Sequence, residues 1–135
     1  MSLPITLLYA CIFAIFALAL SFRVGAARGK TGVSILVGEP QIMDLAERVR
    51  VHQNFVEYVP MFLIVMAAVE LNGGSANWLH GAGVLMLIGR VGHAVGLKHD
   101  NMSHKGRLVG MLGTIGATFI VAIYGLLITY RHFAA

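Results

Sequence analysis

Four long apolar stretches alternate with shorter polar ones along the chain. The apolar stretches run from about Leu3 to Val24, Phe55 to Leu71, Trp78 to Val95 and Leu108 to Tyr130. Each is close to the ~20 residues that an α-helix needs to cross the hydrocarbon core of a bilayer. The pattern therefore predicts four membrane-spanning helices, which form a single domain over residues 1–135.

The polar stretches predict how these helices are joined. Residues 25–40 hold four glycines and end in Pro40, a composition typical of a loop. Proline suits the first turn of a helix, so we expect the second helix to begin at Pro40 and to end at Leu71. Such a helix is ~48 Å long, so its first turns should project beyond the membrane core. Residues 72–75 predict a tight turn, and residues 96–106 predict a polar link.

Basic residues gather at the first and third links and are missing from the second. The flanking residues are Arg23, Arg28, Lys30, Arg48 and Arg50 at the first link, and Lys98, Lys105 and Arg107 at the third. Links rich in Lys and Arg stay in the cytoplasm when a membrane protein is inserted. We therefore expect the first and third links to be cytoplasmic and both termini to lie on the opposite side.

Composition agrees with a protein embedded in a membrane. Hydrophobic residues make up 58% of the chain and charged residues 12%, whereas a soluble domain typically has about 25% charged residues. The first apolar stretch has no basic residue before it and is longer than the ~7 to 15 apolar residues of a secretory signal peptide. We interpret it as a membrane span.

Two other classes of partner find no support in the sequence. The formal net charge is +4, but no basic run is interleaved with aromatic residues, so nucleic-acid binding is not expected. Phosphate-binding glycine loops, metal-binding spacings such as HExxH and paired cysteines are absent from the sequence. A metal site is therefore not expected either.

A polar stripe marks the second helix where its apolar run begins. Arg50, Asn54 and Glu57 follow one another at i, i+4 and i+7, so they share one helix face. His52 points away from this face. If the second helix lies at a subunit boundary, His52 would serve the site of the neighbouring subunit.

Depth arithmetic brings a residue of the third helix to the same level. Glu57 lies ~21 Å from the outer end of its helix at Leu71, and Arg90 lies ~20 Å from the start of the next helix near Asn77. Since the two helices are antiparallel neighbours, we expect Glu57 and Arg90 to form an ion pair. An unpaired charge at this depth costs at least ~2.5 kcal/mol. His93, one turn beyond Arg90, extends the polar patch.

Two interpretations of this polar patch are open. One is a structural ion pair that joins the two helices, with the other arginines extending toward the headgroups. The other is a polar pocket, open to the cytoplasm, for a zwitterionic or anionic small molecule. We favour the pocket because the ion pair gives Arg50, Asn54 and His93 no reason to converge.

Small residues form stripes on the last two helices. These residues are Gly89, Gly92 and Gly96 on the third helix, and Gly106, Gly110, Gly113, Gly116 and Ala117 on the fourth. Such stripes let membrane helices approach closely and are compatible with an oligomer. Whether each stripe faces a helix of the same chain or of another chain stays open at this point.

The second and third helices resemble signatures of the MAPEG family, the membrane-associated proteins in eicosanoid and glutathione metabolism. "RVHQNFVEYVP", residues 50–60, resembles the family's helix 2 signature, in which an arginine, an asparagine, a glutamate and a following tyrosine bind glutathione. The matching residues here are Arg50, Asn54, Glu57 and Tyr58. "GRVGHAVG", residues 89–96, looks like the helix 3 signature, with Arg90 at the arginine position. The likeness covers essentially the whole chain and is closest to small bacterial members.

The resemblance implies an all-α, integral membrane four-helix bundle that assembles as a homotrimer in a bacterial inner membrane. It implies that glutathione binds between neighbouring subunits and that Arg107, at the start of the fourth helix, stabilises the glutathione thiolate. Lys105 is a rival for that role, and Arg28 matches a further arginine near the site. The expected glutathione-binding residues are Arg28, Arg50, His52, Asn54, Glu57, Tyr58, Arg90 and His93.

The implied function is that of a glutathione-dependent transferase or peroxidase acting on lipophilic electrophiles that arrive from the bilayer. Catalytic eukaryotic relatives carry tyrosines where this chain has His93 and Leu97, so fewer contacts to glutathione are expected here. The alternative is a non-catalytic membrane scaffold that binds lipid or glutathione. A four-span multidrug exporter ranks below both, because such exporters rely on an acidic residue in the first span and residues 3–24 contain none.

Overall fold

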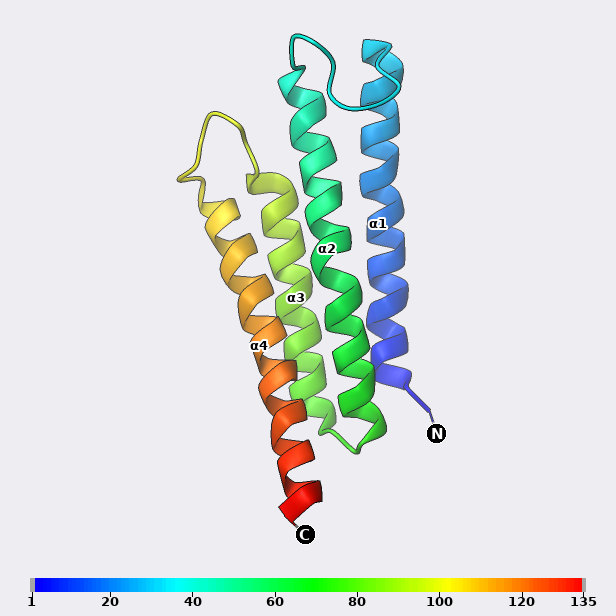
Figure 1. The fold of residues 1–135 in the computed structure, drawn as a ribbon, viewed down its shortest axis with the longest axis vertical. Helices are drawn as coiled ribbons and strands as arrows, with labels where there is room; N and C mark the ends of the chain where they lie inside the picture. The colour runs from blue at the N-terminus through cyan, green and yellow to red at the C-terminus, as the bar shows by residue number, and fades with distance from the viewer. Residues whose placement is uncertain (1, 135) are drawn as a thin grey trace.

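Four antiparallel helices make up the protein. The computed structural model describes residues 2–134, and its helices are α1 (Pro4–Thr31), α2 (Met43–Leu71), α3 (Ala76–Gly96) and α4 (Lys105–Ala134). Both ends of the chain and the α2–α3 turn lie at one end of the bundle, and the two long links lie at the other (Figure 1). Residues 2–134 contain no strand. The predicted all-α four-helix bundle is confirmed.

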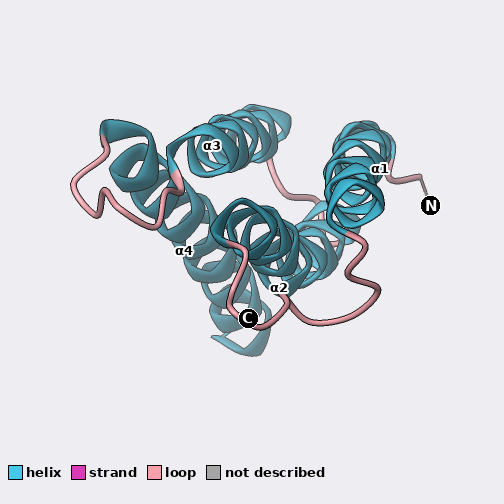
Figure 2. Cartoon of the chain, turned by 90° about the horizontal axis from the view of Figure 1, so that it is seen from above, coloured by secondary structure: helices cyan, strands magenta, loops and turns pink. Residues whose placement is uncertain are grey.

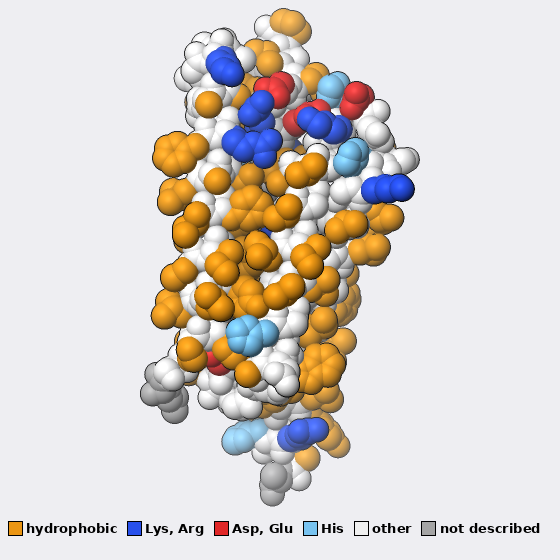
Figure 3. Space-filling model, turned by 180° about the vertical axis from the view of Figure 1, so that it is seen from behind, with side chains coloured by type: hydrophobic (Ala, Val, Ile, Leu, Met, Phe, Trp, Pro, Cys, Tyr) orange, Lys and Arg blue, Asp and Glu red, His pale blue; other side chains and the backbone are white. Residues whose placement is uncertain are grey.

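Three of these helices, α1, α2 and α4, are long and apolar enough to cross a membrane. The 21-residue α3 is less apolar because it carries His80, Arg90 and His93. It nevertheless runs from the end of α2 at one end of the bundle to the start of α4 at the other, and its ~31 Å length covers the hydrocarbon core. On the face that Figure 3 shows, hydrophobic side chains cover most of the length of the bundle, and most charged ones gather at the end with the links.

The first helix is longer than expected, because residues 25–31 continue α1 instead of forming a loop. An isolated glycine costs a helix only about 1 kcal/mol, so Gly25 and Gly29 do not end it. The helix ends at Gly32, which has a φ of 70° and donates its backbone N–H to the carbonyl of Arg28. A left-handed residue of this kind is the usual end of a helix and favours glycine.

The second helix begins at Met43 and not at Pro40, which lies in a turn. The preceding link is folded back on itself: the backbone N–H of Ile42 donates to the carbonyl of Val37 at 2.9 Å. Arg28 Nη1 donates to the carbonyls of Val33 and Leu36 at 3.2 and 3.1 Å. These hydrogen bonds hold the residues around Pro40 in a loop, so the helix begins about one turn later, at Met43.

The core is built from two helix pairs. α1 packs mainly on α2, whereas α3 packs most extensively on α4 (Figure 2). Phe13 of α1 makes edge contacts with Phe55 and Phe62 of α2, with ring centroids 6.1 and 6.4 Å apart. Tyr9 of α1 lies against Gly83 of α3, where an added Cβ would come within 2.3 Å of the ring. Aromatic rings thus hold α1 in place beside both neighbours.

An acidic side chain of α2 caps the start of α1. The Glu70 carboxylate accepts the backbone N–H groups of Ile5 at 2.9 Å and Thr6 at 2.7 Å. The first turn of α1 has no acidic residue of its own. Glu70 therefore satisfies two otherwise unpaired donors and lies at the positive end of the helix dipole.

The facing glycines decide which helix the small-residue stripes contact. A Cβ added at Gly89 would lie 2.9 Å from the backbone of Thr114, and one at Gly96 would lie 2.1 Å from the backbone nitrogen of Arg107. A Cβ at Gly110 would lie 2.6 Å from the Cβ of His93. The stripes of α3 and α4 therefore face each other within one chain.

Replacing a glycine at this contact should loosen the bundle. Gly110→Ala forces the α4 backbone away from His93, and we expect it to lower the free energy of unfolding by about 1 to 3 kcal/mol. Gly81→Ala is the matched control, because an added Cβ at Gly81 meets nothing within 4 Å. Alanine is the better helix former by up to about 1 kcal/mol, so the control should be neutral or stabilising. Thermal unfolding followed by circular dichroism in detergent measures both, and equal effects would contradict this packing.

Candidate functional site

A polar cavity lies between α2, α3 and α4, near the end of the bundle that carries the two long links. Its volume is about 170 Å³. The lining side chains are Asn54 and Tyr58 from α2, Arg90 and His93 from α3, and Arg107, Met111, Thr114 and Ile115 from α4. Five of the nine residues proposed from the sequence, namely Asn54, Tyr58, Arg90, His93 and Arg107, are thereby brought together.

Arg90 is the central residue of this cavity, and it is only 3% exposed. Its Nη1 donates to the side-chain and backbone oxygens of Asn54 at 2.8 and 3.3 Å. Its Nη2 donates to the carbonyl of Gly110 at 3.4 Å and to the hydroxyl of Thr114. The guanidinium carbon lies 5.7 Å from the ring centre of Tyr58. All of these partners are neutral, and Nε is buried without a hydrogen-bond partner.

The predicted ion pair between Glu57 and Arg90 is wrong for the described residues. Glu57 instead pairs with Arg50, with Oε1 and Nη1 3.2 Å apart, and both side chains are about half exposed. Arg90 reaches Asn54, one helical turn before Glu57. The stripe itself is confirmed, since a pair at i, i+7 requires a shared face. The interpretation of the polar patch as a structural ion pair between Glu57 and Arg90 is therefore excluded.

His93 and Arg107 add two more basic side chains to the cavity. His93 is 9% exposed and lies one turn beyond Arg90. Arg107 is half-buried in the first turn of α4, where its backbone passes against Gly96. The side chain of Lys105 is exposed and does not line the cavity. The geometry therefore favours Arg107 over Lys105 as the cation beside a bound molecule.

A salt-bridged cluster fastens the α3–α4 link to α2. Glu47 accepts hydrogen bonds from the backbone and the ring of His99 at 2.9 and 2.7 Å, and from Lys98 at 3.1 Å. Asp100 lies close by, and the atoms of Glu47, His99 and Asp100 that could ligate a metal ion are all within 4.8 Å of one another. The Lys98 ammonium already occupies the same carboxylate, so this cluster is better suited to holding the link than to holding a cation.

Four of the nine proposed residues lie outside the cavity lining. The side chain of Arg28 bonds to the first link, as described above. His52 is half-buried on another face of α2. Arg50 and Glu57 pair with each other on the helix face that also carries Asn54, so they lie at the cavity's rim. Any contact of these four residues with glutathione stays a prediction.

The sequence singled out only Arg107 on α4, through the family resemblance, and missed the other α4 residues of the lining. Arg107, Met111, Thr114 and Ile115 recur at i, i+4, i+7 and i+8, which is the spacing of one helix face. Extending that stripe from Arg107 would have found Thr114. The contact of Glu47 with the link joins residues about 50 positions apart, and no local pattern indicates it.

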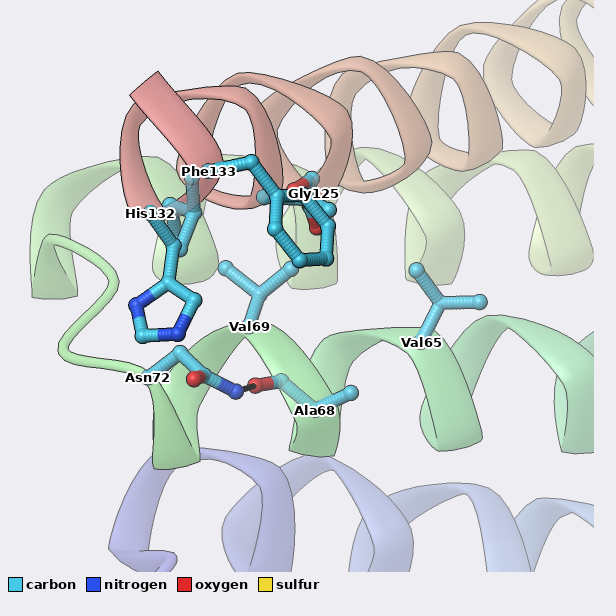
Figure 4. A pocket seen from close by; sticks show the side chains of 9 residues that line it. Val65, Ala68, Val69, Asn72, Gly125, His132 and Phe133 are labelled. Carbon is cyan, nitrogen blue, oxygen red and sulfur yellow. Dashed lines mark hydrogen bonds between the residues drawn. The ribbon is translucent and has the colours of Figure 1, made fainter. Parts of the chain in front are cut away.

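A second cavity of similar size lies at the opposite end of the bundle, between α2 and α4 (Figure 4). Val65, Val69 and Phe133 give it a mostly apolar wall. The amide of Asn72 donates to the carbonyl of Ala68 at 2.8 Å and is thus already engaged. This cavity gathers none of the residues proposed from the sequence, so we assign the candidate site to the cavity around Arg90.

Comparison with known proteins gives both a family and relatives. The chain matches the model of the MAPEG family over residues 6–127, a range that includes every residue lining the cavity. Two curated relatives are called inner membrane protein YecN, one from Escherichia coli strain K12 and one from Escherichia coli O6:H1 strain CFT073. Each is 29% identical over 122 residues, which is 90% of this chain and 90% of the relative. No solved structure matches the chain significantly.

Removing one neutral partner of Arg90 should destabilise the protein. Thr114→Val takes away the hydroxyl that accepts from Nη2, and we expect a loss of about 1 to 3 kcal/mol in the free energy of unfolding. Thr118→Val is the matched control, because the hydroxyl of Thr118 bonds only to the backbone carbonyl one turn before it. Denaturant unfolding of both variants in the same detergent gives the comparison. A loss no larger for Thr114→Val than for Thr118→Val would contradict the role given to Thr114.

Proposed function

Because the chain belongs to the MAPEG family, we propose that it is a glutathione-dependent transferase or peroxidase acting on lipophilic electrophiles in a bacterial inner membrane. The observation that carries the proposal is Arg90, a buried cation with neutral partners and an unused Nε–H. A buried charge is costly unless an opposite charge accompanies it. Since no acidic side chain of this chain lines the cavity, a bound anion is the counter-charge that we propose.

Glutathione has the charges that this cavity lacks. It carries two carboxylates and one ammonium, and a guanidinium binds a carboxylate through paired N–H donors. Arg50 suits one carboxylate through such paired donors, the free Nε–H of Arg90 suits the other, and Glu57 suits the ammonium. Binding would then exchange the Arg50–Glu57 ion pair, which is exposed and weak, for two contacts with the tripeptide.

The size of the cavity supports a site shared between subunits. Its volume of about 170 Å³ is below the ~300 to 1,000 Å³ typical of small-molecule pockets. A single chain therefore encloses only part of a tripeptide. In a homotrimer, a neighbouring subunit would cover the exposed face of α2 and complete the pocket. His52 would then be available to the site of the neighbouring subunit.

Arg107 is the residue proposed to activate the thiol. A free thiol has a pKa of about 8.5, so little thiolate exists at neutral pH. A guanidinium beside the sulfur favours the anion, and lowering the thiol pKa by ~2 requires ~2.7 kcal/mol. Arg107 acts by its charge alone. In conjugation with a chloronitrobenzene, the sulfur forms a bond to the ring carbon, chloride leaves with the bonding pair, and the thiol proton passes to solvent.

A route for lipophilic substrates adjoins the polar cavity. An apolar groove of about 210 Å³ lies beside it and shares Tyr58 and Ile115 with its lining, and Phe119 and Ala122 continue the groove along α4. A molecule dissolved in the bilayer would approach along this groove and meet the sulfur at its inner end. On this proposal the two long links face the cytoplasm, which the basic residues at that end support.

Binding and turnover of glutathione test the proposal directly. The detergent-purified protein is titrated with glutathione by calorimetry and then assayed with a chloronitrobenzene for conjugate. We expect both binding and product. If the protein neither binds glutathione nor forms the conjugate, the proposal is wrong. Binding without product would identify the alternative, a non-catalytic binding protein.

The role of Arg107 has its own test. Arg107→Gln should leave glutathione affinity within a few fold and raise the apparent pKa of the bound thiol by about 1 to 3, because a nearby positive charge is lost. The rate at neutral pH then falls by about tenfold or more, and the pH–rate profile moves to higher pH. Lys105→Gln serves as the control and should leave the profile in place. An unmoved profile for Arg107→Gln would assign thiol activation to another residue.

A further inference from the structure

A larger groove lies at the opposite end of the bundle from the candidate site, between the start of α3 and the end of α4. Its volume is about 400 Å³, and its lining includes Trp78, Phe119, Ile123, Tyr124, Leu127 and Arg131. None of these residues belongs to the polar cavity around Arg90.

The wall of this groove is apolar over the depth of one leaflet. Phe119, Ile123 and Leu127 follow at i, i+4 and i+8 on α4, and each is more than half exposed. From Phe119 to Arg131 the helix rises by ~18 Å. Half of the ~30 Å hydrocarbon core is ~15 Å, so the groove matches a single acyl chain lying along α4.

A rigid aromatic pair borders the middle of the groove. The rings of Trp78 and Tyr124 have centroids 6.5 Å apart. The hydroxyl of Tyr124 accepts the backbone N–H of Ser75 at 2.7 Å, which fixes the ring against the α2–α3 turn. The indole of Trp78 is 60% exposed. The pair thus gives the middle of the groove a fixed aromatic wall.

The groove ends at a positive charge. Arg131 lies in the last turn of α4 and is exposed. Within residues 2–134 it is the one Lys or Arg at this end of the bundle, and no acidic side chain of that range forms an ion pair with it. A guanidinium binds a phosphate through two parallel N–H donors. The charge at the mouth therefore complements an anionic headgroup.

We propose that this groove is a binding site for an anionic phospholipid, with one acyl chain along Phe119, Ile123 and Leu127 and the phosphate at Arg131. Phosphatidylcholine shares the acyl chains and the phosphate but adds a quaternary ammonium, which Arg131 repels. The site is independent of glutathione and lies at the far end of the bundle from the proposed chemistry.

The single tryptophan makes the site measurable, because Trp78 is the only one in the chain. The full-length protein is reconstituted into vesicles of phosphatidylglycerol and phosphatidylcholine at a fixed ratio. In one preparation the phosphatidylglycerol carries bromine near the headgroup end of its acyl chains, and in the other the phosphatidylcholine does. Bromine quenches indole fluorescence on contact, so the two preparations report which lipid lies against Trp78 while the surface charge stays constant.

We expect brominated phosphatidylglycerol to quench Trp78 more strongly, with a relative binding constant about fivefold in its favour. Arg131→Gln should abolish the preference, and Arg131→Lys should retain most of it. Arg23→Gln is the control, because Arg23 is an exposed arginine on α1 away from the groove. Equal quenching by the two lipids in the native protein, or an unchanged preference in Arg131→Gln, would overturn the proposal. Absence of quenching by either lipid would also overturn it and would show that another subunit covers the groove.

Discussion

The close contact between α3 and α4 across facing glycines sets the distances on which the rest of the structure depends. In lipid, helices are held together by packing and hydrogen bonds, because the surroundings are as apolar as the helix surface. At Gly89 and Gly96 the α4 backbone occupies the space that a side chain would need. That approach brings the carbonyl of Gly110 and the hydroxyl of Thr114 to Arg90. The contact that packs the bundle therefore also supplies acceptors to its buried guanidinium.

The same contact brings two guanidinium groups to one cavity. Arg90 and Arg107 line it with no carboxylate among the lining residues. The first turn of α4 has no acidic residue, so the positive end of that helix dipole adds to the field. Within a poorly polarisable membrane interior such a field is weakly screened. An anionic ligand would relieve the repulsion between the two guanidinium groups, and for this reason arginines without a carboxylate indicate a binding site more strongly than a paired Glu57 and Arg90 would.

The sequence predicted features that depend on long runs of residues and missed those that depend on single contacts. Apolar runs of about 20 residues defined the number, order and direction of the helices, because membrane thickness imposes their length. The end of α1 was misplaced because exposed glycines are compatible with a helix, and only Gly32 adopts the left-handed conformation that ends it. Counting residues from the α2–α3 link predicted the relative position of the two helices to within one helical turn. An error of three residues, or ~4.5 Å, was enough to assign Arg90 to Glu57 instead of Asn54.

The candidate site shows the same division. Asn54, Arg90 and His93 could be proposed from helical spacing and depth on α2 and α3, and Tyr58 from the family signature, and all four do meet in one cavity. The family resemblance added Arg28, but in the structure its guanidinium is bonded to the carbonyls of the first link. A long side chain at a helix end can turn toward either the loop or the bundle, and spacing along the helix does not distinguish these directions.

Helix α4 connects the two ends of the molecule. Met111 and Ile115 belong to the polar cavity, Ile115 and Phe119 to the adjoining apolar groove, and Phe119 again to the larger groove that ends at Arg131. One face of one helix thus passes from a cationic cavity through an apolar surface to a second cation. An apolar substrate and an acyl chain would compete for the middle of that face around Phe119. A lipid held at Arg131 would therefore limit how far a lipophilic substrate extends outward, while leaving the sulfur-facing end at Arg107 open.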